Sequence, residues 1–406
     1  MKSYSKVIGG ILLVAGTTIG AGMLALPVST GLAGFFPSLI LLVSCWAFMT
    51  YTAFLMLEVN LSMPENSNLI SMARRMLGKG GEIVSWITYL FLLYALTTAY
   101  VAGSGPIMVN IIHAITGVTI PPLAGSIPLL LLFGLFVYRG TASVDHVNRL
   151  LMFGLIIAYG AMAVMITPYI GSPLLFRTDW PLFLVAVSLV VTSFGYHIII
   201  PSLTTYLNRD VRSLKKAILI GSLIPLAIYV LWEVLILGII PVEGVNGLMQ
   251  GYLCGVDGVQ LLCNLMGENA IGITATLFSL FAIITSFLGV SLSLTDFLAD
   301  GLKIKKSPSG RALLYALTFL PPIAFTLLDP RAFFSALEYA GAFGVIVLLG
   351  LMPALMVWCK RYYHHFESTY KAPGGKFMLL MVMLISLLVI GLEVANKLQL
   401  MKLIDR

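Results

Sequence analysis

Long apolar runs alternate with short polar segments along the whole chain. A run needs about 20 residues to cross the hydrocarbon core as a helix, because lipid offers the backbone no hydrogen-bond partner. The predicted fold class is therefore an all-α integral membrane protein with one transmembrane domain over residues 1–406. We expect eleven transmembrane helices, at residues 6–28, 33–58, 83–112, 124–139, 149–168, 181–206, 215–240, 269–296, 311–328, 332–358 and 377–396.

The basic residues between these runs are unevenly distributed. If the spans alternate in direction from a cytoplasmic N-terminus, 19 of the 24 Lys and Arg residues fall on the N-terminal side and five on the other. Lys and Arg collect in cytoplasmic loops. We therefore expect the N-terminus in the cytoplasm and the C-terminus outside.

The composition excludes several classes of protein. Hydrophobic residues make up 59% of the 406 positions and charged residues 10%, against roughly 25% charged in soluble domains. The net charge of +7 is dispersed between apolar runs, so we expect no nucleic-acid partner. No CxxC pair or GxxxxGK[ST] loop occurs, and we expect no metal, cofactor or ATP coupling. Cys254 and Cys263 share one polar loop outside and could form a disulfide there.

Two of the expected spans contain helix-breaking residues at mid-membrane depth. The first span carries GTTIGAGMLALP at residues 16–27, and the sixth carries TSFGYHIIIPS at residues 192–202. Backbone groups freed by such a break are tolerated only where protein or a water-filled cavity surrounds them. The alternative for the first span is a GxxxG packing face formed by Gly16 and Gly20.

The positions of the two breaks suggest an inverted repeat. The first span runs outward and the sixth runs inward, so residues 6–168 and residues 181–358 have opposite topology. Transporters with this layout hold substrate between two broken helices near the midplane. Half-helix ends carry opposite partial charges, which suits an amino-acid zwitterion. No residue-level repeat is evident, and residues 377–396 form an additional helix.

Ionisable residues within apolar spans are rare and are candidates for ion coupling. His197 lies at the sixth-span break, and imidazole titrates near neutral pH. The alternative role for His197 is a neutral ring that steadies the break. Glu58 ends the second span and Glu233 lies well inside the seventh.

The broken runs, together with YTAFLMLEV, FLLYALTTAYVAGSG and TSFLGVSLSLTDFLAD in the second, third and eighth spans, resemble the hydroxy/aromatic amino acid permease family. The likeness is closest to its tyrosine-specific and tryptophan permease branch, within the amino acid-polyamine-organocation superfamily. This resemblance implies a leucine-transporter-like fold of five plus five inverted helices. It also implies proton symport of an aromatic amino acid across the bacterial inner membrane, with tyrosine first and tryptophan or phenylalanine as alternatives.

The resemblance also assigns roles in the site. The amides of Gly20, Ala21 and Gly22 match the turn that holds the substrate carboxylate, and the carbonyls of Thr18 and Phe194 match the ammonium site. The full set of expected substrate-binding residues is Thr17, Thr18, Gly20, Ala21, Gly22, Met23, Tyr94, Thr97, Phe194, Gly195, Tyr196 and Phe287.

Proton coupling is expected at His197 first, with Glu58 and Glu233 behind it. Some members of the superfamily use a lysine of the fifth span, and none lies between Arg149 and Pro168.

Two other functions remain open from the sequence. A sodium-coupled symporter of the same fold would use the hydroxyls of Thr285, Ser286 and Ser293 with carbonyls of the first span. A membrane-embedded enzyme would use Asp296 and Asp300, which have the DxxxD spacing that can hold a metal-bound diphosphate. The HExxH pattern is missing, and our prediction is a transporter rather than an enzyme.

Overall fold

The structure is a computed structural model that describes residues 2–65, 67–139, 141–267, 269–305, 307–364, 366 and 369–398. These residues form helices and connecting turns, with no strand among them. The α-helices are α1 (Lys2–Thr18), α2 (Gly22–Thr30), α3 (Phe35–Leu61), α4 (Leu69–Thr116), α5 (Pro122–Arg139), α6 (Thr141–Ile166), α7 (Ser172–Leu175), α8 (Val187–Ser193), α9 (Ile200–Tyr206), α10 (Val211–Leu237), α11 (Leu248–Cys254), α12 (Gly258–Met266), α13 (Ala270–Gly301), α14 (Pro308–Leu328), α15 (Ala332–Tyr339), α16 (Met352–Tyr362) and α17 (Gly375–Lys397). Short 3-10 helices are η1 (Thr167–Tyr169), η2 (Trp180–Ala186) and η3 (His197–Ile199), and η4 (Ala340–Leu351) is a π-helix.

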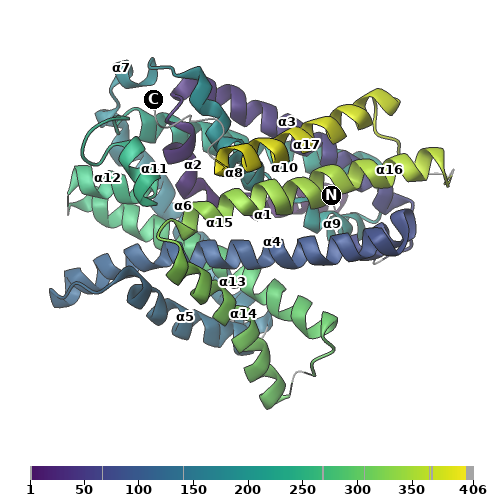
Figure 1. Ribbon diagram of the computed structural model, residues 1–406, viewed down its shortest axis with the longest axis horizontal. Helices are drawn as coiled ribbons and strands as arrows, with labels where there is room; N and C mark the ends of the chain where they lie inside the picture. The colour runs from purple at the N-terminus through teal and green to yellow at the C-terminus, as the bar shows by residue number, and fades with distance from the viewer. Residues whose placement is uncertain are drawn as a thin grey trace.

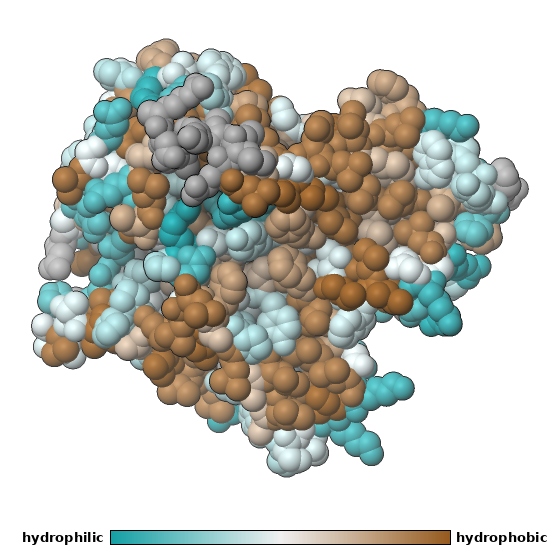
Figure 2. Space-filling view, viewed as in Figure 1, coloured by the Kyte–Doolittle hydropathy of each residue, from teal (hydrophilic) through white to brown (hydrophobic). Residues whose placement is uncertain are grey.

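The long helices lie side by side in one bundle (Figure 1). Helix α4 runs along most of its length, with α7, α11 and α12 at one end and α9 and the end of α16 at the other. We call the α9 end the N-terminal side and the α11 end the opposite side. Apolar residues cover the middle of the visible face, and polar residues gather toward the two ends (Figure 2). This distribution is the one that a bilayer requires.

Within the described residues, ten helices are long and apolar enough to cross a membrane, and a bent pair makes eleven spans. The bent pair consists of residues 6–18 of α1 and helix α2, which meet at 59°. The expectation of eleven spans in an all-α membrane protein is confirmed.

Both expected breaks are present. The first span is interrupted between Thr18 and Gly22. The sixth runs through η2, α8, η3 and α9, and its α-helical hydrogen bonding stops at Ser193. Glycine and proline in these runs disfavour a continuous helix, and each break leaves backbone groups unpaired.

Polar side chains define where several helices begin. The side chains of Asn68, Asp210, Asp257, Asn269 and Ser307 each accept a hydrogen bond from an amide in the first turn of α4, α10, α12, α13 and α14 respectively. Such caps satisfy amides that the helix itself leaves free.

The third span is longer than the sequence pattern suggested. Helix α4 begins at Leu69 rather than at residue 83 and contains a kink at Gly78, where φ is 72°. The polar segment before the kink includes Arg74 and Arg75. A prediction based on apolar runs therefore did not include this part of the helix.

The tenth span changes its hydrogen-bonding pattern midway, from α15 through the π-helix η4 to α16. Near the start of η4, Gly341 packs directly against the backbone of α8. A Cβ at Gly341 would overlap the carbonyl oxygen of Ser188. The backbones of the sixth and tenth spans are therefore in direct contact on the opposite side of the bundle.

Candidate transport site

A cavity of about 380 Å³ lies in the centre of the bundle, beside both breaks. Its walls come mainly from residues 16–20 and Gly22 of the first span, one face of α4, residues 285–293 of α13 and the break of the sixth span. Gly16, Thr17 and Ser293 line it and are exposed, so the cavity opens toward the N-terminal side. Its volume falls within the usual range for small-ligand sites, about 300–1,000 Å³.

The first-span break presents backbone donors to this cavity. Among the described residues, the amides of Gly20 and Gly22 have no hydrogen-bond acceptor, and both residues line the cavity. The amide of Ala21 donates to Ser286 Oγ on α13, at 2.9 Å. The break thus offers two free amides at the start of α2, where the helix dipole favours a negative group.

Serine side chains pack closely against both of these glycines. A Cβ at Gly20 would lie 3.1 Å from Ser286 Oγ, and one at Gly22 would lie 3.3 Å from Ser193 Oγ. These distances are tighter than most contacts of a Cβ atom, so a larger residue would require the serine side chain to shift by a few tenths of an ångström.

Three side chains of α10 hold the first span on both sides of its break. Tyr229 donates from its hydroxyl to the carbonyl of Thr18 at 2.7 Å, and Trp232 Nε1 donates to the carbonyl of Met23 at 2.9 Å. Thr30 Oγ1 of α2 donates to Glu233 Oε1 at 2.7 Å. Positions 229, 232 and 233 share one face of α10. This helix therefore binds the first span on both sides of its break and holds the two parts in place.

The sixth-span break exposes a smaller set of groups. Gly195, Ile198 and Ile199 line the cavity. His197 is fully buried away from the cavity lining, with Nε2 2.8 Å from Thr52 Oγ1 of α3. Among the described residues its Nδ1 has no hydrogen-bond partner.

The structure divides the expected substrate-binding residues into two groups. Those that line the cavity are Thr17, Thr18, Gly20, Gly22 and Gly195. Those outside its lining are Ala21, Met23, Tyr94, Thr97, Phe194, Tyr196 and Phe287.

Several of the second group have other partners. Tyr94 donates its hydroxyl to the carbonyl of Leu317 on α14, and Thr97 donates to the carbonyl of Leu93 within α4. The ring of Phe194 packs edge-on against Tyr229, with centroids 5.4 Å apart. Phe287 stacks on Phe319 at 5.5 Å.

A different face of α4 forms the cavity wall. Tyr89, Leu92, Leu93, Leu96 and Tyr100 line it. Their spacing of three or four residues follows one helical stripe, offset from the expected stripe through Tyr94 and Thr97. The periodicity was visible in the sequence, but the direction in which the stripe points depends on packing.

Besides the tyrosines of α4, two polar residues of the cavity were not expected from the sequence. Tyr229 of α10 and Asn148 of α6 both line it. Each lies in or beside an apolar run, where a lone tyrosine or asparagine is a weak signal. The proximity of Tyr229 to Glu233, four residues later on the same face, was the available indication.

Glu58 is buried in a cluster on the N-terminal side. Its carboxylate accepts from Lys360 Nζ at 3.1 Å, from Arg361 Nε at 2.8 Å and from the amide of Ala372 at 2.7 Å, and Arg361 makes a second, shorter bond through its terminal nitrogen. The cluster ties α3 to α16 and to the segment before α17. We name these four residues the Glu58 cluster.

Glu233 has a different environment. It is fully buried, and its only side-chain partner among the described residues is Thr30. Its Oε2 has no partner, and no basic side chain of the described chain forms an ion pair with it. Glu233 does not line the cavity.

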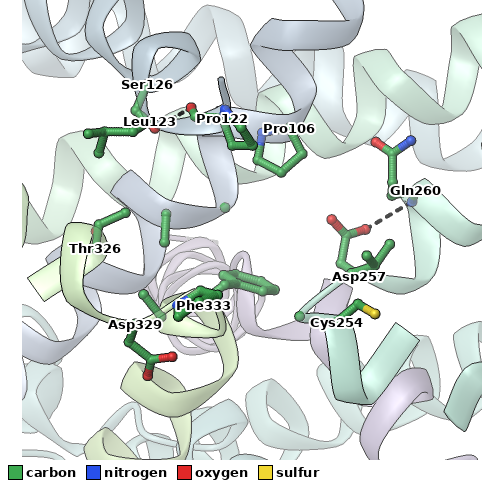
Figure 3. Close-up of a pocket in the computed structure, with 16 residues that line it drawn as sticks. Pro106, Pro122, Leu123, Ser126, Cys254, Asp257, Gln260, Thr326, Asp329 and Phe333 are labelled. Atoms are coloured by element: carbon green, nitrogen blue, oxygen red, sulfur yellow. Dashed lines mark hydrogen bonds between the residues drawn. The ribbon is translucent and has the colours of Figure 1, made fainter. Parts of the chain in front are cut away.

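A second hollow of about 410 Å³ lies on the opposite side, between α4, α5, the turn joining α11 to α12, and the start of α15. Phe333 lies between Asp257 and Asp329 in the view of Figure 3. Asp257 caps α12 by accepting from the amides of Val259 and Gln260, at 2.8 and 3.1 Å. Burial raises the pKa of Asp257 to about 6, although these two amides oppose the rise.

The hydroxyls suggested for sodium line the cavity but have protein partners. Thr285 and Ser293 donate to the carbonyls of Phe281 and Gly289 in their own helix, and Ser286 accepts from Ala21. Cys254 and Cys263 are free thiols. No group of three or more His, Cys, Asp or Glu side chains among the described residues is arranged to hold a metal ion.

Comparisons with known proteins agree with this architecture. The model of the tryptophan/tyrosine permease family matches residues 3–393. The tyrosine-specific transport system 1 of Haemophilus influenzae is 35% identical over 397 residues, which cover 96% of this chain and 97% of that protein. The tryptophan-specific transport protein of Pseudomonas aeruginosa is 34% identical, covering 93% of this chain and 92% of that protein.

A third relative is more distant. The low affinity tryptophan permease of Escherichia coli strain K12 is 30% identical, covering 86% of this chain and 85% of that protein. The family and these relatives are named as permeases and transport proteins, so the enzyme alternative built on Asp296 and Asp300 is set aside. With its eleven apolar spans and a family match over nearly its whole length, the chain is a multi-pass membrane permease that belongs to the tryptophan/tyrosine permease family.

Proposed function

We propose that this protein imports aromatic amino acids by proton symport across the inner membrane of a bacterium. Tyrosine is the first candidate substrate, and tryptophan and phenylalanine follow. The N-terminus lies in the cytoplasm and the C-terminus in the periplasm. Residues 6–168 and 181–358 form the two inverted repeats, and the substrate is exchanged between the two sides by alternating access.

The observation that carries the proposal is the opening of the first-span break into the central cavity. The free amides of Gly20 and Gly22 suit a carboxylate, and the carbonyls at the end of α1 suit an ammonium group. A zwitterionic amino acid needs both at a separation of a few ångströms. The Phe194 carbonyl is a poorer candidate for the ammonium than that of Thr18, because Phe194 does not line the cavity.

The rest of the cavity suits an aromatic side chain. Leu92, Leu93 and Leu96 form an apolar wall on α4, and Tyr89 and Tyr100 add rings at either end of the same stripe. Aromatic rings pair edge-to-face or offset with gains of about 0.5–1.5 kcal/mol beyond area burial. The names of the relatives, tyrosine-specific and tryptophan-specific, support the same substrate class.

Of the three proposed coupling groups, Glu233 has the environment best suited to carry a proton. Glu58 forms ion pairs with Lys360 and Arg361, so protonation of its carboxylate would leave two buried cations without a counter-charge. His197 is held by Thr52 and faces away from the cavity lining. Among the described residues Glu233 lacks a cationic partner and binds Thr30 of α2 directly, which links its charge to the second half of the first span.

The test is uptake in proteoliposomes that contain the purified protein. With a pH gradient, an inside-negative potential and no sodium, labelled tyrosine should accumulate inside. One proton moving through about 100 mV supplies about 2.3 kcal/mol, or roughly a fiftyfold concentration ratio. Competition by the twenty amino acids should show tyrosine, tryptophan and phenylalanine as the strongest inhibitors. Accumulation that appears only when sodium is supplied would transfer the proposal to a sodium symporter that uses Thr285, Ser286 and Ser293.

A further inference from the structure

Tyr229 contacts both broken spans at once. Its hydroxyl lies 2.7 Å from the carbonyl oxygen of Thr18, at the end of α1, and 3.0 Å from that of Ser193, at the end of α8. Its ring is fully buried and packs edge-on against Phe194. A single side chain of the seventh span therefore joins the first span to the sixth at their breaks.

The need for such a group follows from electrostatics. The last carbonyls of a helix lack intrahelical donors and carry its negative partial charge. Here two helix ends of the same sign converge on one point inside the bundle. Without a positive group or a hydrogen-bond donor between them, both carbonyls would be buried and unsatisfied.

A hydroxyl can serve both carbonyls but leaves each with acceptor capacity. The hydroxyl has one hydrogen, which is shared between two acceptors, and each carbonyl oxygen has two lone pairs. Thr18 and Tyr229 both line the cavity. The Thr18 carbonyl can thus accept a second donor from the cavity while Tyr229 holds it in place.

We propose that Tyr229 is a positioning residue that locks the two breaks together and presents the carbonyl end of α1 to the ammonium group of the substrate. The ammonium assignment rests on the proposed function, whereas the locking of the two breaks does not. Trp232 lies one turn along the same helix and holds only the first span, through Met23.

The chain offers a matched control for removal of the hydroxyl. Tyr159 of α6 is also a tyrosine whose hydroxyl donates to a backbone carbonyl, that of Ile228, at 3.2 Å. Its ring packs on Trp232 and Phe278, and it does not line the cavity. Tyr159→Phe removes the same atom next to Tyr229 without touching either break.

Hydrogen exchange of the ligand-free protein in nanodiscs tests the locking role. In Tyr229→Phe, amide exchange should rise about tenfold in both residues 16–23 and residues 192–199, which corresponds to the loss of one hydrogen bond. Trp232→Phe should affect only the first segment, and Tyr159→Phe neither. If Tyr229→Phe leaves either segment unchanged, the two breaks are not locked by this hydroxyl.

Competition against labelled tyrosine tests the ammonium role. The competitors are unlabelled tyrosine and 3-(4-hydroxyphenyl)propionate, which lacks the amino group. In Tyr229→Phe the inhibition constant of tyrosine should rise about tenfold, whereas that of the des-amino acid should change little. The two inhibition constants should therefore become more similar than in the unmodified protein. A merely structural role would weaken both equally, and this result would overturn the ammonium role. If no aromatic amino acid competes in the unmodified protein, the proposed function fails while the exchange result still decides the locking role.

Discussion

Glu58 and Glu233 look alike in the sequence, since each is a lone acid in or at the end of an apolar run, but the structure surrounds them differently. Glu58 meets two basic side chains and a backbone amide, whereas Glu233 meets one threonine hydroxyl. Both are fully buried. Burial alone therefore does not mark a coupling group, because protonation of an acid that is paired with buried cations leaves those cations without a counter-charge.

The largest expected effect is the loss of the Glu58 charge. Glu58→Ala leaves the ammonium of Lys360, whose side chain is 1% exposed, buried beside Arg361 with no counter-charge. Breaking a buried ion pair in this way costs about 3–5 kcal/mol of unfolding free energy. Thermal and denaturant unfolding in detergent would measure it.

The control for Glu58→Ala is Arg74→Ala, which removes a surface ion pair to Glu82 whose side chains are 65% and 32% exposed. This change should cost at most about 1 kcal/mol. Equal losses in the two variants would contradict the distinct role of the Glu58 cluster.

The second effect concerns coupling rather than stability. Glu233→Gln keeps an acceptor for the hydroxyl of Thr30 but cannot release a proton. Accumulation of labelled tyrosine should fall from about fiftyfold to no gradient, while exchange of labelled for unlabelled tyrosine continues. Uptake and counterflow in proteoliposomes measure the two quantities separately.

His197→Ala is the comparison for that experiment. If His197 only steadies the sixth-span break, this variant still accumulates substrate, although its rate is reduced. Loss of accumulation in His197→Ala together with full accumulation in Glu233→Gln would place coupling at the histidine instead.

The smallest change in stability is expected from the titration of Asp257, a third buried acid, which lies outside the membrane spans. Its pKa is raised by burial from the ordinary value of 3.8 to about 6. The folded protein therefore keeps a proton that the unfolded chain releases near pH 4, so stability is greatest at acid pH and falls as the pH rises through 6. Between pH 5 and pH 7 the loss should be about 1 kcal/mol.

Asp257→Asn should flatten this slope, because asparagine has no carboxyl group to titrate, and it should keep the helix capped as well as aspartate does. Asp210→Asn is the control. Asp210 also caps its helix, α10, by accepting from the amides two and three residues later, but its hydrogen bond with Ser213 lowers its pKa, so its titration lies below this pH window. Melting curves at pH 5, 6 and 7 would measure the slopes, and an unchanged slope in Asp257→Asn would contradict the assignment.

The spans and both breaks were predictable because they depend on local composition. Run length sets the number of spans, and the glycines and proline of residues 16–27 weaken the helix where they stand. Seven of the expected substrate-binding residues, among them Tyr94 and Phe287, lie outside the cavity lining, which shows the limit of this approach. A small rotation of α4 about its own axis brings Leu96 and Tyr100 to the cavity instead of Tyr94. That rotation depends on how α4 packs against neighbouring helices.

The hydrogen-bond partners of the polar residues could not be predicted from the sequence either. Tyr229 bonds to a carbonyl 211 positions earlier, and Glu58 bonds to side chains 302 and 303 positions later. In the sequence a tyrosine within an apolar run is typical of packing, and an acid at a span end is typical of a solvated interface. Apart from the i, i+4 spacing of Tyr229 and Glu233, the local sequence pattern does not distinguish these common roles from the observed ones.

The backbone contact between Gly341 and Ser188 restricts how this permease can rearrange. Because even a methyl group does not fit there, α8 and the start of η4 have no room to slide past each other, and Thr192 adds a hydrogen bond to the carbonyl of Leu337 at 3.0 Å. We therefore expect α8 and the start of η4 to move together in any rearrangement. The interrupted backbone at Phe194–Tyr196 is the adjacent place where the sixth span can bend.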